Sequence, residues 1–302
     1  MIIDFSVIIV SWNSKKYLER CVKSVQRSTQ DLSCEIIVVD NASTDGSADF
    51  VRDAFPLVSL IRLPANTGFA HACNVGITHA QGRYICFLNP DTELLNNALK
   101  SMVTFLDKRP LAALVGGSLQ NEDGSRQPSV RSFPRPFIAL GIAFKLHHIP
   151  GLRRLFHAYF QDAFNYETSQ QVDQVMGAFF IVRNFFLAQV GGFDERFFLW
   201  FDEVDLMRHA HELGWQVWYY PRAKAIHWGA QSFSKVSSYE NQKQFLISMR
   251  RYIRKWHGAF AAAPLILVTP VILFCYRAAS FTLSHAHGIK AKIVSRKSVH
   301  NV

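Results

Sequence analysis

The chain has 302 residues, of which 49% are hydrophobic and 19% charged, and it contains no low-complexity tract or fixed-period repeat. This composition excludes a mainly disordered protein and allows one substantial hydrophobic core with a smaller appendage. The formal charge of +10 calls for an anionic partner, which nucleic acid, a membrane surface or a phosphate-rich substrate would each supply. Basic residues at 250–255 and 290–297 flank a long apolar run, an arrangement that favours the membrane.

Short β-branched runs alternate with helical patterns in the first part of the chain. Buried strands are predicted at 5–10, 36–39, 58–63 and 84–88. Between them, apolar residues recur at the spacing of amphipathic helices. Strands that alternate with helices of this length predict right-handed βαβ units, and therefore an α/β fold with a mostly parallel, Rossmann-like sheet.

Two carboxylates follow predicted strands, Asp40 after the second and Asp91 after the fourth. Ligands of such sheets bind outside the carboxyl ends of the strands, so two carboxylates at equivalent positions favour a nucleotide crevice over two helix caps. The loop Ser11–Ser14 after the first strand contains no glycine, and no Walker lysine loop is present. A diphosphate is therefore expected to bind through a divalent metal on Asp91.

Prolines and arginines interrupt the pattern between Ser125 and Gln171. Two interpretations remain open for this stretch: an excursion that lines an acceptor site, and a solvated surface loop. A strand is predicted at 175–182 and a turn at 191–195, followed by a strand at 216–220.

An acidic segment, Asp202–Asp205, follows an aromatic run and opens a predicted helix that ends at Gly214. Acidic residues at a helix N-terminus complement the helix dipole, which accounts for Asp205. Three acids behind an aromatic run favour a catalytic carboxylate as well, and Glu203 and Asp202 are the candidates. His227 is a lone histidine by pattern, and such residues are more often structural than ligands.

Seven segments are informative when taken together: Val7–Asn13, Val38–Gly46, Asn66–Ala70, Phe87–Asp91, Gly191–Glu195, Phe201–Leu206 and His227–Ser232. Together they resemble the family-2 inverting glycosyltransferases of the GT-A fold, particularly their rhamnosyltransferase-like branch. They occur in the family's order and spacing over residues 5–235. The resemblance implies a catalytic domain at 1–235, with a nucleotide-binding half at 1–120 and an acceptor and catalytic half at 121–235.

The resemblance also implies roles for individual residues. Glu203 occupies the position of the catalytic base, with Asp202 as its rival. Asp91 and His227 would hold Mn²⁺ or Mg²⁺ on the diphosphate, and Asp40 would hydrogen-bond the pyrimidine base. Further residues expected to shape the nucleotide pocket are Ser11, Asn13, Asn66, Gly68 and Asn89.

The sequence departs from the family pattern at three places. The metal motif reads Asn89-Pro90-Asp91 without a first aspartate, so metal binding is expected to rest on Asp91, His227 and the diphosphate itself. Glu203 stands where aspartate is commoner, and Ala230 stands where glycine is frequent.

The Gln-x-x-Arg-Trp signature of processive synthases is absent from the sequence. We therefore expect transfer of a single sugar to a hydroxyl of a glycan or a polyprenyl-linked glycan. The resemblance favours dTDP-L-rhamnose as the donor, with a UDP-sugar as the alternative.

Residues 259–276 form an almost uninterrupted apolar run of 18 residues. About 20 residues are needed to cross a bilayer, and Pro264 and Pro270 interrupt the run. An interfacial or re-entrant element on the inner leaflet is expected, with packing against the catalytic domain as the alternative. Residues 236–302 are accordingly predicted to be a helical, apolar and basic region that associates with the membrane.

The cysteines and the first residues of the chain predict the cellular compartment of the protein. The five cysteines occur singly, without the spacing of a metal or redox motif, and Cys21, Cys73 and Cys86 fit as small core residues. Unpaired thiols fit a reducing compartment, and Met1–Asp4 lacks the features of a signal peptide. The cytoplasmic face of the plasma membrane is the predicted location.

Two other functions compete with glycosyl transfer. A nucleotidyltransferase shares this kind of core, but the sequence lacks its glycine-rich, lysine-containing phosphate loop. A non-enzymatic basic protein that binds membranes or nucleic acid would explain the charge. Nucleic acid is not expected as a partner, because no segment resembles a groove-reading helix or an aromatic stacking platform.

Overall fold

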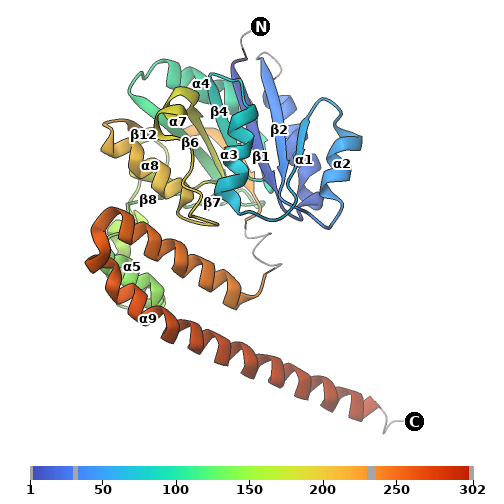
Figure 1. Ribbon diagram of the computed structural model, residues 1–302, viewed down its shortest axis with the longest axis vertical. Coiled ribbons are helices and arrows are strands. Elements are labelled where there is room, and N and C mark those ends of the chain that lie inside the picture. Colours follow the sequence, from blue (N-terminus) through green and yellow to red (C-terminus); the bar gives the residue numbers. More distant parts are fainter. Residues whose placement is uncertain (1–2, 30–32, 230–235, 299–302) are drawn as a thin grey trace.

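A mixed sheet in the strand order β3-β2-β1-β4-β11-β6-β12-β5 forms the centre of the molecule (Figure 1). The computed structural model describes residues 3–29, 33–229 and 236–298. The first four strands run parallel, as the sequence predicts. They are β1 (Phe5–Ser11), β2 (Cys34–Asp40), β3 (Ser59–Arg62) and β4 (Tyr84–Leu88).

Helices cover both faces of these strands. α1 (Lys15–Ser28), α2 (Ser47–Ala54) and α3 (Phe69–His79) connect them, and α4 (Ala98–Asp107) follows the fourth. Alternate residues of β1 enter different cores: Val7 and Ile9 pack with α1 and α4, whereas Ile8 and Val10 pack with α3. Burial on both faces explains why these strands are continuous apolar runs in the sequence.

The other half of the sheet mixes strand directions. β11 (Phe179–Arg183) lies antiparallel to β4 and to β6 (Ala112–Gln120), and β12 (Gln216–His227) lies parallel to β6. β5 (Thr92–Leu95) closes the edge, antiparallel to β12. Among the central strands only β11 and β5 run against the others, so the prediction of a mostly parallel α/β sheet is confirmed.

Two strands differ in extent from the prediction. The strand predicted at 175–182 is interrupted. β10 (Gln174–Val175) ends before β11 begins, and Met176, Gly177 and Ala178 lie between the two strands. β12 continues through Pro221 to His227, because a shift of register against β6 between Tyr220 and Lys224 accommodates the proline.

The stretch from 125 to 171 holds short elements. Two strands, β7 (Arg126–Gln127) and β8 (Val130–Arg131), precede α5 (Pro136–Ala143). The turns η1 (Leu146–His148) and η2 (Arg153–Phe156), the helix α6 (His157–Phe160) and the strand β9 (Gln170–Gln171) follow. β7 pairs with β6, β9 with β12, and β8 with β10. Two further helices, α7 (Asn184–Val190) and α8 (Asp202–Glu212), precede β12.

The last helix, α9 (Ser238–Ser298), is bent at Gly258, whose φ of 87° breaks the helical conformation. Before the bend, Leu246 and Met249 share a core with Phe201 and Val204 at the start of α8. After the bend, α9 packs on α5, and Figure 1 shows both helices on one side of the sheet. By length and composition α9 is able to cross a membrane. Its most apolar stretch has a mean hydropathy of 2.2, and 22% of that stretch is buried.

Candidate active site

A cavity of about 700 Å³ lies at the carboxyl ends of β1 and β4, where the sequence places the nucleotide crevice. Segments that are far apart in the chain form its wall, including the break at 176–178, the start of α8, the end of β12 and the start of α9. Seven of the residues predicted for the site line it: Asn66, Gly68, Asn89, Asp91, Asp202, Glu203 and His227.

Sheet pairing brings Asp91 and His227 together. His227 ends β12 and lies opposite Thr92 of β5, the residue next to Asp91. The Nε2 atom of His227 is 3.5 Å from Oδ1 of Asp91, and both side chains are about one-tenth exposed. A carboxylate and an imidazole this close together could both hold one divalent cation.

Gln127 of β7 fixes the orientation of the His227 ring. Its Nε2 donates to His227 O and to Asn121 Oδ1, both at 2.6 Å, and its Oε1 lies 2.9 Å from His227 Nδ1. Because the amide nitrogen already donates twice, Oε1 acts as the acceptor and Nδ1 carries the proton. In that tautomer the lone pair is on Nε2, the nitrogen that lies 3.5 Å from Asp91, as in a metal ligand held by a neighbouring hydrogen bond.

The donor set for a cation is small. Within the part of the chain that the structure describes, no three His, Cys, Asp or Glu side chains gather as a metal site. A carboxylate and an imidazole suit Mn²⁺ or Mg²⁺, and a cation here would take its remaining ligands from the substrate or from water. The residues therefore fit the expectation that the diphosphate completes the site.

The acidic pair begins α8 after an unusual backbone conformation. Trp200 and Phe201 both have positive φ values, 61° and 65°, which L-residues adopt at a cost in free energy. Asp202 is 3% exposed, and its Oδ2 atom has no hydrogen-bond partner. Glu203 faces the gap between β10 and β11, where a Cβ atom on Gly177 would lie 3.3 Å from Glu203 Cγ. The break in the predicted strand therefore makes room for Glu203.

The two carboxyl groups differ in acidity. Burial raises the pKa of Asp202 well above its usual range, and the charge of Glu203 raises it further. Burial also raises the pKa of Glu203, but a hydrogen bond from Asp202 and the positive charge of Arg131 oppose that rise. The rise is larger for Asp202, which therefore keeps its proton to higher pH than Glu203 does.

Three residues predicted for nucleotide binding, Asp40, Ser11 and Asn13, are not among those that line the cavity. Asp40 lies beside Ser11 in the sheet, and its buried Oδ1 has no hydrogen-bond partner. Ser11 Oγ is 2.8 Å from Ser14 Oγ. Asn13 Oδ1 accepts from Thr44 N at 2.7 Å. The Ser14 and Thr44 contacts hold the loops after β1 and β2, while Val10 and Trp12 form the cavity wall.

The loop before α3 is held by a network of amides. Asn41 donates to Asn66 Oδ1 and to Gly68 O, at 3.0 and 3.1 Å. Gly68 has a φ of +90°, and a Cβ atom there would lie 2.6 Å from Phe198 O. Only glycine permits this approach, which places the loop against the segment that leads to the acidic pair. Asn89 contributes through its backbone, which donates to Ala178 O at 2.9 Å.

Several residues of the cavity wall were not predicted. Gln127 and Arg131 come from the stretch 125–171, which therefore lines the cavity in part and is exposed elsewhere. Glu240, Asn241 and Gln244 come from the start of α9, in the region predicted to associate with the membrane. The departure at Ala230 lies outside the described residues.

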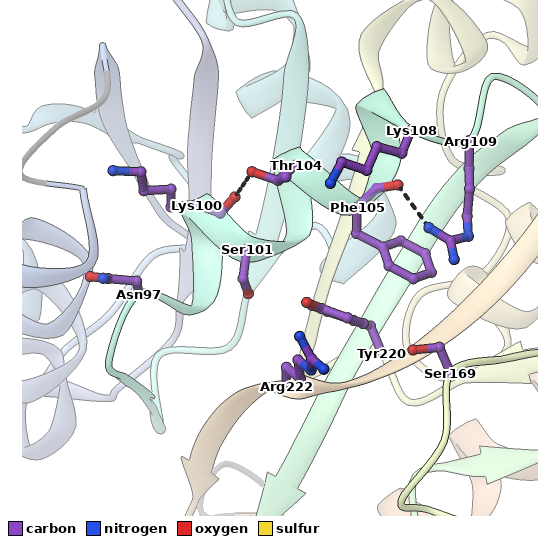
Figure 2. Close-up of a pocket in the computed structure, with 10 residues that line it drawn as sticks. All are labelled: Asn97, Lys100, Ser101, Thr104, Phe105, Lys108, Arg109, Ser169, Tyr220 and Arg222. Atoms are coloured by element: carbon purple, nitrogen blue, oxygen red, sulfur yellow. Dashed lines mark hydrogen bonds between the residues drawn. The ribbon is translucent and has the colours of Figure 1, made fainter.

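A second cavity of about 530 Å³ lies between α4 and β12 (Figure 2). Phe105, Tyr220 and Arg222 line it, and the guanidinium of Arg109 stacks 3.8 Å from the ring centroid of Phe105. None of the predicted site residues lines this cavity, so it is not the candidate active site.

Residues 6–167, more than half of the chain, match the model of the family described as "Glycosyl transferase family 2". The chain belongs to glycosyltransferase family 2, and its resemblance to the rhamnosyltransferase-like branch is confirmed. Over 237 residues it is 27% identical to the N-acetylglucosaminyl-diphospho-decaprenol L-rhamnosyltransferase of Mycobacterium tuberculosis. The alignment covers 75% of this chain and 76% of that protein.

Solved structures agree on the fold. The mannosyltransferase PcManGT from Pyrobaculum calidifontis, in complex with GDP-Man and Mn²⁺, superposes with a TM-score of 0.56 at 18% identity, over 96% of this chain and 79% of that one. S. aureus TarS 1-349 in complex with UDP gives a TM-score of 0.53 at 18% identity, over 87% and 71%. The predicted GT-A fold is thereby confirmed.

Proposed function

We propose that this glycosyltransferase moves one rhamnosyl residue from dTDP-L-rhamnose to a hydroxyl of a lipid-linked glycan, in the synthesis of a cell-surface polysaccharide. The proposal rests on one observation: Glu203 with Asp202, and Asp91 with His227, face a single cavity from three separate segments. The rhamnosyltransferase of M. tuberculosis supports the choice of donor and of a lipid-linked acceptor. A UDP-sugar is the alternative donor.

Glu203 acts as the catalytic base in this proposal. Its carboxylate takes the proton of the acceptor hydroxyl while that oxygen attacks the anomeric carbon and the bond to the diphosphate breaks. Asp202, whose pKa is raised further by burial, stays protonated beside Glu203 in this proposal. One base without a second nucleophile gives inversion at the anomeric carbon.

Asp91 and His227 are the residues proposed to hold Mn²⁺ or Mg²⁺. When bound, the cation would neutralise the negative charge that develops on the departing nucleoside diphosphate. Asp40 is proposed to accept a hydrogen bond from the pyrimidine base, on the strength of the family resemblance. Ser11, Asn13, Asn66, Gly68 and Asn89 would set the shape of the loops around the nucleotide.

The proposed catalytic domain spans 1–235, and the proposed membrane region spans 236–302 at the cytoplasmic face. Contacts across that boundary are extensive, because Leu246 and Met249 pack against Phe201, and Glu240 lines the cavity. The start of α9 is therefore proposed to contribute to acceptor binding as well.

The test uses the full-length protein with a polyprenyl-diphosphate-linked GlcNAc acceptor. We expect transfer of rhamnose from dTDP-L-rhamnose in the presence of Mn²⁺, detected by mass spectrometry of the product, and loss of transfer in chelator. A thermal-shift series with dTDP- and UDP-sugars identifies the donor independently of the acceptor. Transfer from UDP-sugars alone would overturn the choice of donor, and full activity in chelator would overturn the metal site.

A further inference from the structure

After the bend at Gly258, α9 exposes an apolar face. Phe260, Leu267, Val271 and Phe274 are 96, 75, 60 and 72% exposed. Their spacing of seven, four and three residues places them on one side of the helix. The opposite side, which includes Ala262, Leu265, Thr269 and Ile272, is buried.

The helix α5, which packs on α9, also exposes apolar side chains. Phe137 and Phe144, seven residues apart, are 69 and 46% exposed, while Ala139 and Ala143 pack in the core shared with α9. Lys145 Nζ lies 5.0 Å from the ring centroid of Tyr276, so the end of α5 lies beside the end of the apolar stretch of α9. We call the six exposed residues of the two helices the apolar face: Phe137, Phe144, Phe260, Leu267, Val271 and Phe274.

The positive charge of the protein is concentrated in the same region. Residues 241–302 contain ten of the 33 Lys and Arg residues and none of the 23 Asp and Glu residues. They therefore carry a formal charge of +10, and residues 1–240, with 23 of each kind, sum to zero. The segment 136–161, which begins with α5, contains Lys145, Arg153 and Arg154 and no Asp or Glu, and Arg153 pairs with Asp162 at 2.7 Å.

We propose that the apolar face inserts into the surface of a bilayer that contains anionic lipids, with α9 lying along the membrane. Apolar side chains bounded by cations match the acyl chains and acidic headgroups of such a surface. Because the other side of α9 is held against α5, the helix does not cross the bilayer. A second copy of this chain would bring a like charge of +10 to the interface, which opposes self-association through it.

This inference deepens the membrane location given under the proposed function, and it holds for any sugar donor. Full-length protein is mixed with vesicles of phosphatidylcholine alone, or of equal parts phosphatidylcholine and phosphatidylglycerol, and floated on a density gradient. We expect binding to the anionic vesicles and weak binding to the neutral ones. The double substitution Leu267→Asp with Phe274→Asp should weaken binding at least about tenfold, because two apolar side chains that would enter the bilayer are lost.

A matched control is available in Leu57, which is 93% exposed and lies between α2 and β3. Leu57→Asp should leave vesicle binding unchanged. Replacing Lys145 or Arg277 by Gln should weaken binding to anionic vesicles by about fivefold each. Unchanged binding of the Leu267→Asp, Phe274→Asp protein, or a lipid-free dimer that this pair abolishes, would overturn the proposal.

The depth of insertion is measured at Cys275, which is exposed, whereas Cys21, Cys73 and Cys86 are buried and Cys34 is partly buried. A fluorophore on Cys275 should be quenched by lipids that carry a nitroxide near the glycerol backbone. Stronger quenching by nitroxides at the chain ends would place Cys275 near the centre of the bilayer and overturn the interfacial arrangement. Both readouts are independent of catalysis, so failure of the proposed sugar transfer leaves them interpretable.

Discussion

Gln127 holds His227 at two points: its Oε1 accepts from Nδ1 of the ring, and its Nε2 donates to the backbone oxygen of the same residue. The two residues are 100 positions apart in the chain, on β7 and at the end of β12. Their contact selects the tautomer that has its proton on Nδ1, which leaves Nε2, the nitrogen nearer Asp91, without a proton. The proposed metal site thus depends on a residue that binds no metal itself.

Replacing Gln127 by Leu should therefore weaken Mn²⁺ binding in the presence of nucleoside diphosphate by about ten- to a hundredfold. The affinity is measured by electron paramagnetic resonance of free Mn²⁺, and ¹⁵N spectra of His227 report the tautomer. Gln26→Leu, on the exposed side of α1, is the control and should leave the affinity unchanged. An unaltered affinity in the Gln127→Leu protein would show that the ring needs no such support.

The roles of the acidic pair separate in two substitutions. Glu203→Gln removes the base and should lower kcat by about a hundred- to ten-thousandfold, with donor affinity retained. Asp202→Asn keeps a neutral side chain that still donates a hydrogen bond, so kcat should fall about tenfold or less. The measurement is steady-state transfer together with calorimetric titration of the donor. The reverse order of effects would identify Asp202 as the base.

The pH dependence follows from the shifted pKa of Glu203. A base is active above its pKa, and burial raises the pKa of Glu203 from the ordinary value of 4.5, so kcat/KM should fall on acidification at a pH above that value. Because the charge of Arg131 lowers this pKa, Arg131→Gln should move the acid limb to higher pH. An acid limb that stays in place in the Arg131→Gln protein would contradict the assignment.

Lys255 joins α9 to two carboxylates of the sheet domain. Its Nζ lies 2.8 Å from Asp194 Oδ2 and 2.7 Å from Asp205 Oδ2, and the Asp205 side chain is 1% exposed. Lys255→Met removes the positive charge that pairs with the buried carboxylate of Asp205. The substitution should lower the free energy of unfolding by about 3 kcal/mol, measured by urea denaturation. Lys243→Met removes the pair with Glu240, whose side chains are 39% and 44% exposed, and should change the free energy of unfolding by less than about 1 kcal/mol.

These contacts also refine the interpretation of Asp205. The sequence pattern assigned it to the dipole of α8, and it does lie in the first turn of that helix. In addition it accepts a hydrogen bond from Trp256 Nε1 at 2.8 Å, beside the ion pair with Lys255. Partners about fifty residues away leave no mark on a local pattern, so the sequence alone did not indicate this role.

The parallel half of the sheet was predictable because its strands are buried on both faces and therefore appear as apolar runs. Asp91, His227, Asp202 and Glu203 were predicted through motifs whose spatial meaning the family resemblance supplied. The break at Gly177 was not predicted, because 175–182 is strand-like in composition and only the proximity of Glu203 requires the gap. Gln127 was missed because its importance depends on the pairing of β7 beside β12, which local periodicity does not encode.

The core shared by α8 and the first half of α9 has a practical consequence for protein production. Shortening an apolar C-terminal region is a common way to improve expression, and the sequence suggests a cut near residue 235. Such a cut would uncover Phe197, Phe201 and Val204, and it would remove one wall of the cavity. A soluble version is better designed by keeping the chain through His257 and altering the apolar face beyond it.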